Sequence, residues 1–130
     1  MPSVLIIAHG SRRQDSNNEI SMLADKVATH LPHQLSSVHI AFLEFAKPSI
    51  TDAINECFNN GIDDLLVLPY FLSAGNHVTN DIPETIEALI PSWPNKKLTL
   101  LPHIGALEQM ATLIANACLP STMEHSPKGT

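Results

Sequence analysis

Short apolar runs alternate along this chain with longer segments in which apolar residues recur every three or four positions. The runs are typical of buried strands, and the recurrence is typical of amphipathic helices. Four runs predict strands, at residues 4–8, 38–43, 64–69 and 98–101. The third run, Asp-Leu-Leu-Val-Leu-Pro, is apolar nearly throughout, as expected for a strand that is covered on both faces.

Helical periodicity fills the segments between these runs. The first helical segment ends at Pro32, which cannot continue a helix. The second begins near Pro48, a residue suited to the first turn of a helix, and stops at the Asn-Gly pair 60–61. A third spans apolar positions between 82 and 90, and a fourth runs from about 106 to 118.

Strands that are regularly separated by helices predict a parallel sheet with right-handed crossovers. The fold class is therefore α/β, with three αβα layers and helices on both faces of a four-stranded sheet. The common strand order for such a sheet is 2-1-3-4. We expect a single domain over residues 1–119 and a frayed tail over residues 120–130, which lack periodicity.

Composition narrows the class of protein. The chain has 130 residues, 44% of them hydrophobic and 15% charged, as in an ordinary globular domain. No apolar run approaches the roughly 20 residues of a membrane span, so no membrane role is expected. The formal net charge of -6 disfavours a nucleic-acid partner, which normally requires a basic surface.

The opening residues and the cysteines indicate a compartment. An apolar stretch follows Met1, but no basic leader precedes it, so it is interpreted as a strand and not as a signal peptide. Cys57 and Cys118 lie far apart in apolar helical segments. Both are expected to be buried free thiols in a reducing cytoplasm.

Candidate metal ligands follow three of the predicted strands. In a parallel α/β sheet, ligands bind beyond the carboxyl ends of the strands, where the strand order reverses. His9 follows the first strand, Glu44 the second, and His77 lies a few residues beyond the third. Imidazole with carboxylate suits cobalt, ferrous iron, nickel or zinc, and thiolates are absent from this rim. The sequence therefore predicts an open metal site at this rim.

A candidate anion site lies beside His9. Gly10 allows a tight turn, and Ser11, Arg12 and Arg13 lie where the start of a helix presents free amide groups. These two arginines are the only ones in the chain. Either could hold a carboxylate or a phosphate.

Three segments carry a family resemblance. They are Val-Leu-Ile-Ile-Ala-His-Gly-Ser-Arg-Arg at 4–13, Phe-Leu-Glu-Phe-Ala-Lys-Pro-Ser-Ile at 42–50, and Leu-Pro-Tyr-Phe-Leu-Ser-Ala-Gly-Asn-His-Val-Thr-Asn-Asp-Ile-Pro at 68–83. In this order and spacing they resemble the class II chelatases, and among these the short form of the sirohydrochlorin cobaltochelatase family, CbiX. The resemblance extends from residue 4 to about residue 90.

The resemblance implies insertion of a divalent metal into sirohydrochlorin, a tetrapyrrole, for cobalamin or siroheme synthesis. His9 and His77 would be metal ligands and bases, with Glu44 as a third, acidic participant in catalysis. Co²⁺ or Fe²⁺ would be the substrate metal, and no tightly bound cofactor is implied. Because long family members carry two such domains with a cleft between them, a single domain implies a homodimer.

Insertion of a metal sets further requirements. Two pyrrole N–H protons must leave, and a neutral imidazole is a suitable acceptor near neutral pH; either histidine could serve. The substrate carries several carboxylates and a flat apolar face, which call for charge-assisted hydrogen bonds and apolar contacts. The residues expected to contact it are Gly10, Ser11, Arg12, Tyr70, Phe71, Leu72, Ser73 and Gly75.

Two other functions remain open. One is a metal-binding or metal-delivery protein that keeps the site without efficient catalysis. The other is a phosphate-binding domain that uses the turn at 9–13, which predicts tight phosphate binding without metal dependence. His103 follows the fourth strand on the same rim and is a weaker candidate ligand.

Overall fold

The sheet has four parallel strands. The structure, a computed structural model, describes residues 2–32 and 37–120. Its strands are β1 (Ser3–Ala8), β2 (Val38–Phe42), β3 (Asp64–Pro69) and β4 (Lys97–Leu100). All pairs are parallel, in the order β2-β1-β3-β4, and β1 and β3 lie at the centre. The predicted fold class and strand order are confirmed.

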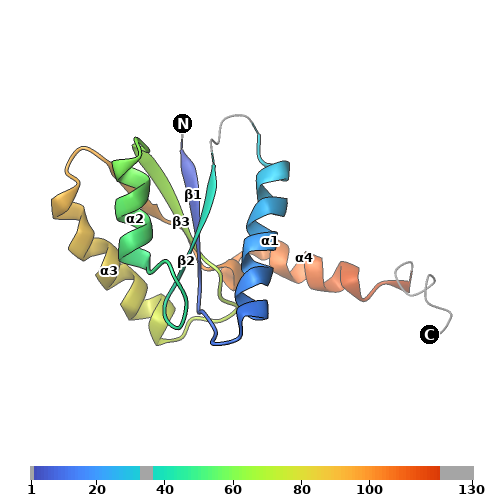
Figure 1. Cartoon of the computed structure of the whole chain (residues 1–130). Helices are drawn as coiled ribbons and strands as arrows, with labels where there is room; N and C mark the ends of the chain where they lie inside the picture. Colours follow the sequence, from blue (N-terminus) through green and yellow to red (C-terminus); the bar gives the residue numbers. More distant parts are fainter. Residues whose placement is uncertain (1, 33–36, 121–130) are drawn as a thin grey trace.

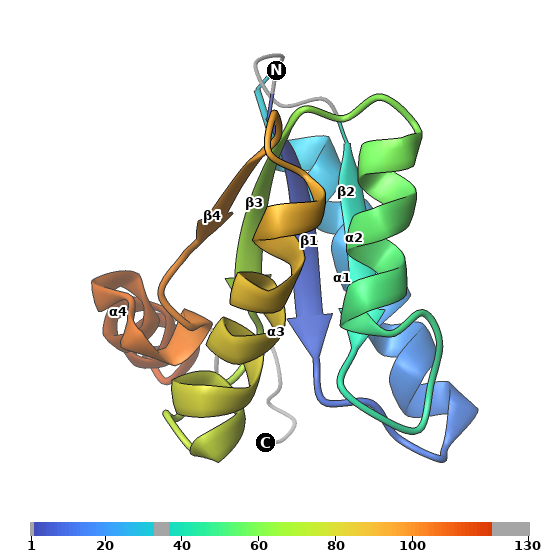
Figure 2. The same ribbon diagram turned by 90° about the vertical axis from the view of Figure 1, so that its left-hand side faces the viewer.

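Helices cover both faces of this sheet, as Figures 1 and 2 show. α1 (Gln14–His30) lies on one face, and α2 (Ile50–Asn59) and α3 (Ile82–Leu89) lie together on the other. α4 (Glu108–Ala117) extends away from the sheet (Figure 1). Among the described residues, no helix is both long and apolar enough to cross a membrane.

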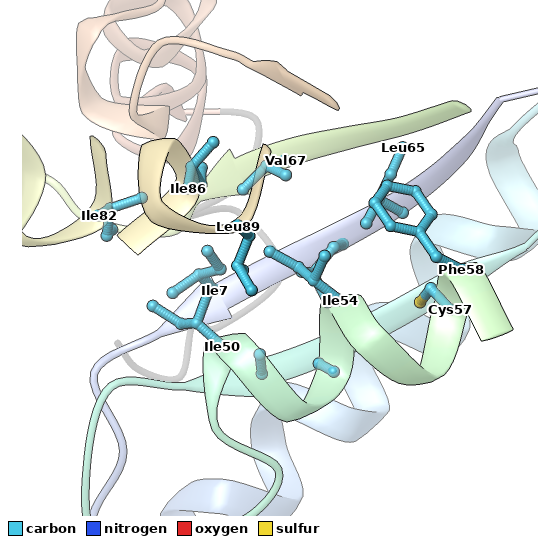
Figure 3. Close-up of a cluster of buried hydrophobic side chains, with 13 residues drawn as sticks. Ile7, Ile50, Ile54, Cys57, Phe58, Leu65, Val67, Ile82, Ile86 and Leu89 are labelled. Atoms are coloured by element: carbon cyan, nitrogen blue, oxygen red, sulfur yellow. The ribbon is translucent and has the colours of Figure 1, made fainter. Parts of the chain in front are cut away.

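Alternation along β1 divides the core into two parts. Leu5 and Ile7 point toward α2 and α3, where they join the larger apolar cluster (Figure 3). Val4 and Ile6 point the other way and pack with Ala24 of α1. Because both faces of a central strand are buried, its sequence is a continuous apolar run without alternation.

The start of α2 differs from the prediction. Pro48 does not lie in the first turn of α2, which begins at Ile50 after Ser49 as its N-cap. The Ser49 hydroxyl accepts a hydrogen bond from the Asp52 amide (3.1 Å), and the Pro48 carbonyl accepts one from the Phe42 amide (2.9 Å). A capping hydroxyl is a stronger start signal than proline, because it satisfies a free amide of the first turn.

The C-terminal part of the chain departs furthest from expectation. α4 begins at Glu108, and a separate 3₁₀ turn at Ile104–Ala106 precedes it. Cys57 is buried as predicted, but Cys118 is exposed, so the prediction that both thiols are buried is wrong. Cys118 is exposed because α4, which it follows, extends away from the sheet and buries none of its residues. From residue 121 on, the expected tail lies outside the described residues.

Candidate metal centre

Three possible metal ligands meet beyond the carboxyl ends of β1, β2 and β3. One ligand atom each from His9, Glu44 and His77 lies within 4.8 Å of the other two. His9 Nε2 lies 2.6 Å from Glu44 Oε2, and the two imidazole rings are 5.1 Å apart between centroids. The structure thus brings together the three residues that the sequence placed on one rim. We refer to them as the triad.

The triad is open to solvent. The side chains of His9 and Glu44 are 51% and 46% exposed, and that of His77 is 42% exposed. A structural metal site is normally closed by four protein ligands, whereas a working site leaves a coordination position free. Three exposed nitrogen and oxygen donors therefore fit a metal that enters and leaves.

The backbone carries His9 to Glu44. The Leu43 amide donates to the Ala8 carbonyl and the Glu44 amide to the His9 carbonyl, each at 3.0 Å. The pairing of β1 with β2 thus continues beyond both strands. A Cβ atom at Gly10, where φ is +97°, would lie 1.8 Å from the Glu44 carbonyl oxygen. Only glycine allows this approach, which places the two side chains in contact.

A buried asparagine holds the turn after β1. The Ser11 amide donates to Asn17 Oδ1 (3.0 Å), and Asn17 Nδ2 donates to the Ser11 carbonyl (2.8 Å). Asn17 is 6% exposed. The sequence analysis missed this residue because it lies in a polar run. Its position, however, continues the spacing of the apolar stripe that includes Ile20 and Ala24, and a polar residue in register with such a stripe is a usable signal.

The second histidine also has a carboxylate partner. His77 begins a π-helical turn, His77–Asp81, that leads into α3. Its Nδ1 lies 2.7 Å from Asp81 Oδ2. A carboxylate that accepts from one ring nitrogen leaves the other nitrogen free to bind a metal. Asp81 was missed in the sequence, although its place four residues after His77 puts it on the same helical face.

Two hollows adjoin the triad. One, of about 370 Å³, lies between α2 and α3 and is lined by Glu44 and His77 of the triad, together with Asp81 and the hydroxyls of Ser49, Thr51 and Thr85. The other, of about 240 Å³, is lined by His9 on the opposite side. A third, of about 360 Å³, lies along the β2 edge and includes no triad residue.

The structure separates the predicted substrate contacts into two groups. Gly10, Ser11, Tyr70 and Phe71 line the second hollow beside His9. Leu72 is 74% exposed, and Ser73 and Gly75 are exposed in the same loop. The guanidinium carbon of Arg12, another predicted contact, is 4.5 Å from the centre of the Phe45 ring. Arg13 is the N-cap of α1, and His103 is not part of the triad.

The fold and the triad define a class of protein: a parallel α/β domain with an open imidazole–carboxylate cluster, able to hold a metal ion, at the switch point of its sheet. The CbiX family model matches residues 3–119. A sirohydrochlorin cobaltochelatase of Sulfurisphaera tokodaii is 31% identical over 114 residues, which are 88% of each chain. This chain belongs to the CbiX family.

One solved structure and several further relatives are also similar to this chain. A putative cobalamin biosynthesis CbiX protein of Marinobacter aquaeolei has a solved structure that matches with a TM-score of 0.79 and 25% identity, covering 97% of this chain and 100% of that one. A sirohydrochlorin ferrochelatase of Bacillus subtilis is 25% identical over 112 residues, 86% of this chain but 42% of its own length. Five further sirohydrochlorin cobaltochelatases are matched over 56% to 63% of their length.

Proposed function

We propose that this chain inserts a divalent metal, cobalt or ferrous iron, into sirohydrochlorin. The observation that carries the proposal is the triad, in which two imidazoles and one carboxylate converge within 4.8 Å and remain accessible. Such donors suit borderline divalent ions and exchange them more readily than thiolates do. The names of the relatives from Sulfurisphaera and Bacillus support cobalt and iron, respectively, as substrate metals.

The chemistry follows from the atoms of the triad. A hydrogen bond of 2.6 Å joins His9 Nε2 and Glu44 Oε2, and a divalent substrate ion held by both groups replaces this contact. His77, oriented by Asp81, supplies a third donor. As the metal passes into the macrocycle, two pyrrole protons leave, and the vacated imidazole and carboxylate are the nearest acceptors.

The proposed substrate contacts surround the triad. The turn at Gly10 and Ser11 lines one hollow, and Tyr70 and Phe71 line the same hollow and add aromatic side chains to it. Leu72, Ser73 and Gly75 lie in the exposed loop that follows Phe71. In this proposal the loop contacts the apolar face of the macrocycle. Arg12 supplies the positive charge that a polycarboxylate needs from a chain with a net charge of -6.

The assembly in this proposal is a homodimer. Leu113 and Ile114 of α4 are 62% and 58% exposed. Exposure of two large apolar side chains to water is unfavourable for an isolated chain and indicates an interaction surface. The Bacillus relative is more than twice as long as the segment that matches it, which leaves room for a second unit of similar size. A second copy of this chain, packed on α4, supplies that unit and completes a cleft over the triad.

Sedimentation of the native chain tests the dimer. We expect a species of twice 14.1 kDa, and Leu113→Glu converts it to the monomer because a charge replaces buried apolar contact. Met22→Glu is the matched control, since Met22 is 59% exposed on α1. A native chain that sediments as a monomer would contradict this part of the proposal.

The proposed compartment is a reducing cytoplasm, with which two free cysteines are compatible. The proposed pathway is cobalamin or siroheme synthesis.

The direct experiment is anaerobic incubation of the native chain with sirohydrochlorin and Co²⁺ or Fe²⁺, followed by absorbance. Turnover above the uncatalysed rate ranks the two metals. Metal binding without turnover would instead identify a metal-delivery protein.

A further inference from the structure

Phe45 has a backbone conformation that a phenylalanine rarely adopts. Its φ is +66°, in the left-handed region that favours glycine and asparagine, and the residue is 51% exposed. The residue lies in the turn that leads from Glu44 back to Ser49, which pairs with Phe42. A bulky side chain at such a position destabilises the fold and buries little surface in return. Strain of this kind clusters at sites of function.

The ring of Phe45 lies between a triad residue and an arginine. Its centroid is 6.4 Å from that of His9, and the guanidinium carbon of Arg12 lies 4.5 Å from it. At that distance the planar cation is attracted by the face of the ring. The structure therefore places a positively charged group at a defined position beside the metal centre.

The guanidinium of Arg12 has its hydrogen-bonding groups available. Across residues 2–32 and 37–120, its side chain makes no ion pair or hydrogen bond, and its contact is the aromatic ring. A contact of the guanidinium carbon with the ring uses none of the N–H groups as hydrogen-bond donors, so these remain available. Two of these can donate in parallel to one carboxylate, an arrangement that lysine cannot provide.

We propose that Phe45 is a positioning residue that holds the Arg12 guanidinium flat, so that Arg12 binds one carboxylate at the rim of the tetrapyrrole while the centre of the ring lies at the triad. This inference rests on the proposed function. It assigns carboxylate binding to Arg12 and not to the adjacent Arg13. Arg13 is the N-cap of α1 and has no ring contact. Stacking reduces the motion of a long side chain, so less entropy is lost when the carboxylate binds.

The test measures binding of metal-free sirohydrochlorin, by its fluorescence, to the native chain and to three variants. Arg12→Lys keeps the charge but loses the planar pair of donors, and Phe45→Asn removes the ring with a residue that tolerates positive φ. Arg13→Lys is the matched control. We expect each of the first two to raise Kd by about tenfold or more, and Arg13→Lys to change Kd by less than about twofold.

Two further measurements separate positioning from general damage. The double variant Arg12→Lys/Phe45→Asn should bind about as well as the weaker single variant, because both changes disable one contact. The methyl ester of sirohydrochlorin, which lacks the carboxylate charges, should bind the native chain and Arg12→Lys equally. Co²⁺ binding in the absence of tetrapyrrole should be the same in all variants.

Several results would overturn the inference: unchanged Kd in Arg12→Lys or Phe45→Asn, an equal effect of Arg13→Lys, or dissociation of an oligomer by Phe45→Asn, which would make Phe45 an interface residue. Failure of the proposed function is distinguishable. In that case the native chain does not insert metal, whatever the pattern of tetrapyrrole binding among the variants.

Discussion

Asp81 accepts a hydrogen bond from Nδ1 of His77 at 2.7 Å, one helical turn after it in the chain. This contact fixes the orientation of the ring and leaves Nε2 free, so in the proposed site Nε2 is the nitrogen that binds the metal. Carboxylate partners of ligating histidines also raise the basicity of the ligand, so they strengthen metal binding without contacting the metal.

Replacement of Asp81 should therefore weaken metal binding. We expect Asp81→Ala to lower Co²⁺ affinity by about 10- to 100-fold, measured by the visible absorption of bound Co²⁺. Glu87→Gln, on the exposed side of α3, removes a negative charge from the same helix and should leave the affinity unchanged. An equal loss in both variants would show that overall charge, and not the contact with His77, is responsible.

Gly10→Ala should dismantle the triad. Its Cβ would lie 1.8 Å from the Glu44 carbonyl oxygen, so the loop that carries Glu44 must move away from His9. Gly61 is a close control, because its φ of +96° is equally strained for alanine but no atom lies within 4 Å of an added Cβ. Gly61→Ala should lower the free energy of unfolding by about 1–2 kcal/mol and keep the Co²⁺ affinity. Gly10→Ala should lower both the free energy of unfolding and the Co²⁺ affinity. Retained Co²⁺ affinity in Gly10→Ala would contradict this account of the site.

Asn17→Ala should loosen the turn that carries His9. It removes two hydrogen bonds and leaves the amide and carbonyl of Ser11 without these partners. A loss of about 1–3 kcal/mol in the free energy of unfolding is expected from urea denaturation. The neighbouring Asn18 is exposed, and Asn18→Ala should change stability by less than about 0.5 kcal/mol. Equal losses in the two variants would show that the hydrogen bonds between Asn17 and Ser11 do not stabilise this turn.

The two thiols should react very differently. Burial, with a smaller contribution from Glu56, raises the pKa of the Cys57 thiol to about 11. Its thiolate is the reactive form, so at pH 8 Cys57 should be alkylated at least about 100-fold more slowly than the exposed Cys118. A raised pKa in the folded chain also means that this thiol contributes stability below its unfolded pKa, and that the contribution is lost as pH rises toward 11. Similar labelling rates, followed by mass spectrometry, would show that Cys57 is not buried in solution.

The sequence predicts the sheet and the rim because both follow from local patterns. Continuous apolar runs specify buried strands, and the rule that ligands bind beyond their carboxyl ends places His9, Glu44 and His77 together without any measured distance. The strand bounds differ from the predicted ones by one residue at most at either end.

The missed features depend on how the chain turns and packs, which the periodicity of apolar residues does not report. Phe45 has a left-handed φ within the turn between Phe42 and Ser49, and nothing in the residue itself indicates it. The departure of α4 from the sheet is equally invisible, because Leu113 and Ile114 follow the same periodicity as buried helical residues. Periodicity reports that a face is apolar and does not report which surface covers it.

The most direct test of the central claim is anaerobic insertion of Co²⁺ and Fe²⁺ into sirohydrochlorin by the native chain, by His9→Ala and His77→Ala, and by His103→Ala as a rim histidine outside the triad. We predict that turnover by the native chain and by His103→Ala is comparable, and that folded His9→Ala and His77→Ala lose at least about 100-fold. Full turnover in either triad variant, or none above the uncatalysed rate in the native chain, would contradict the account.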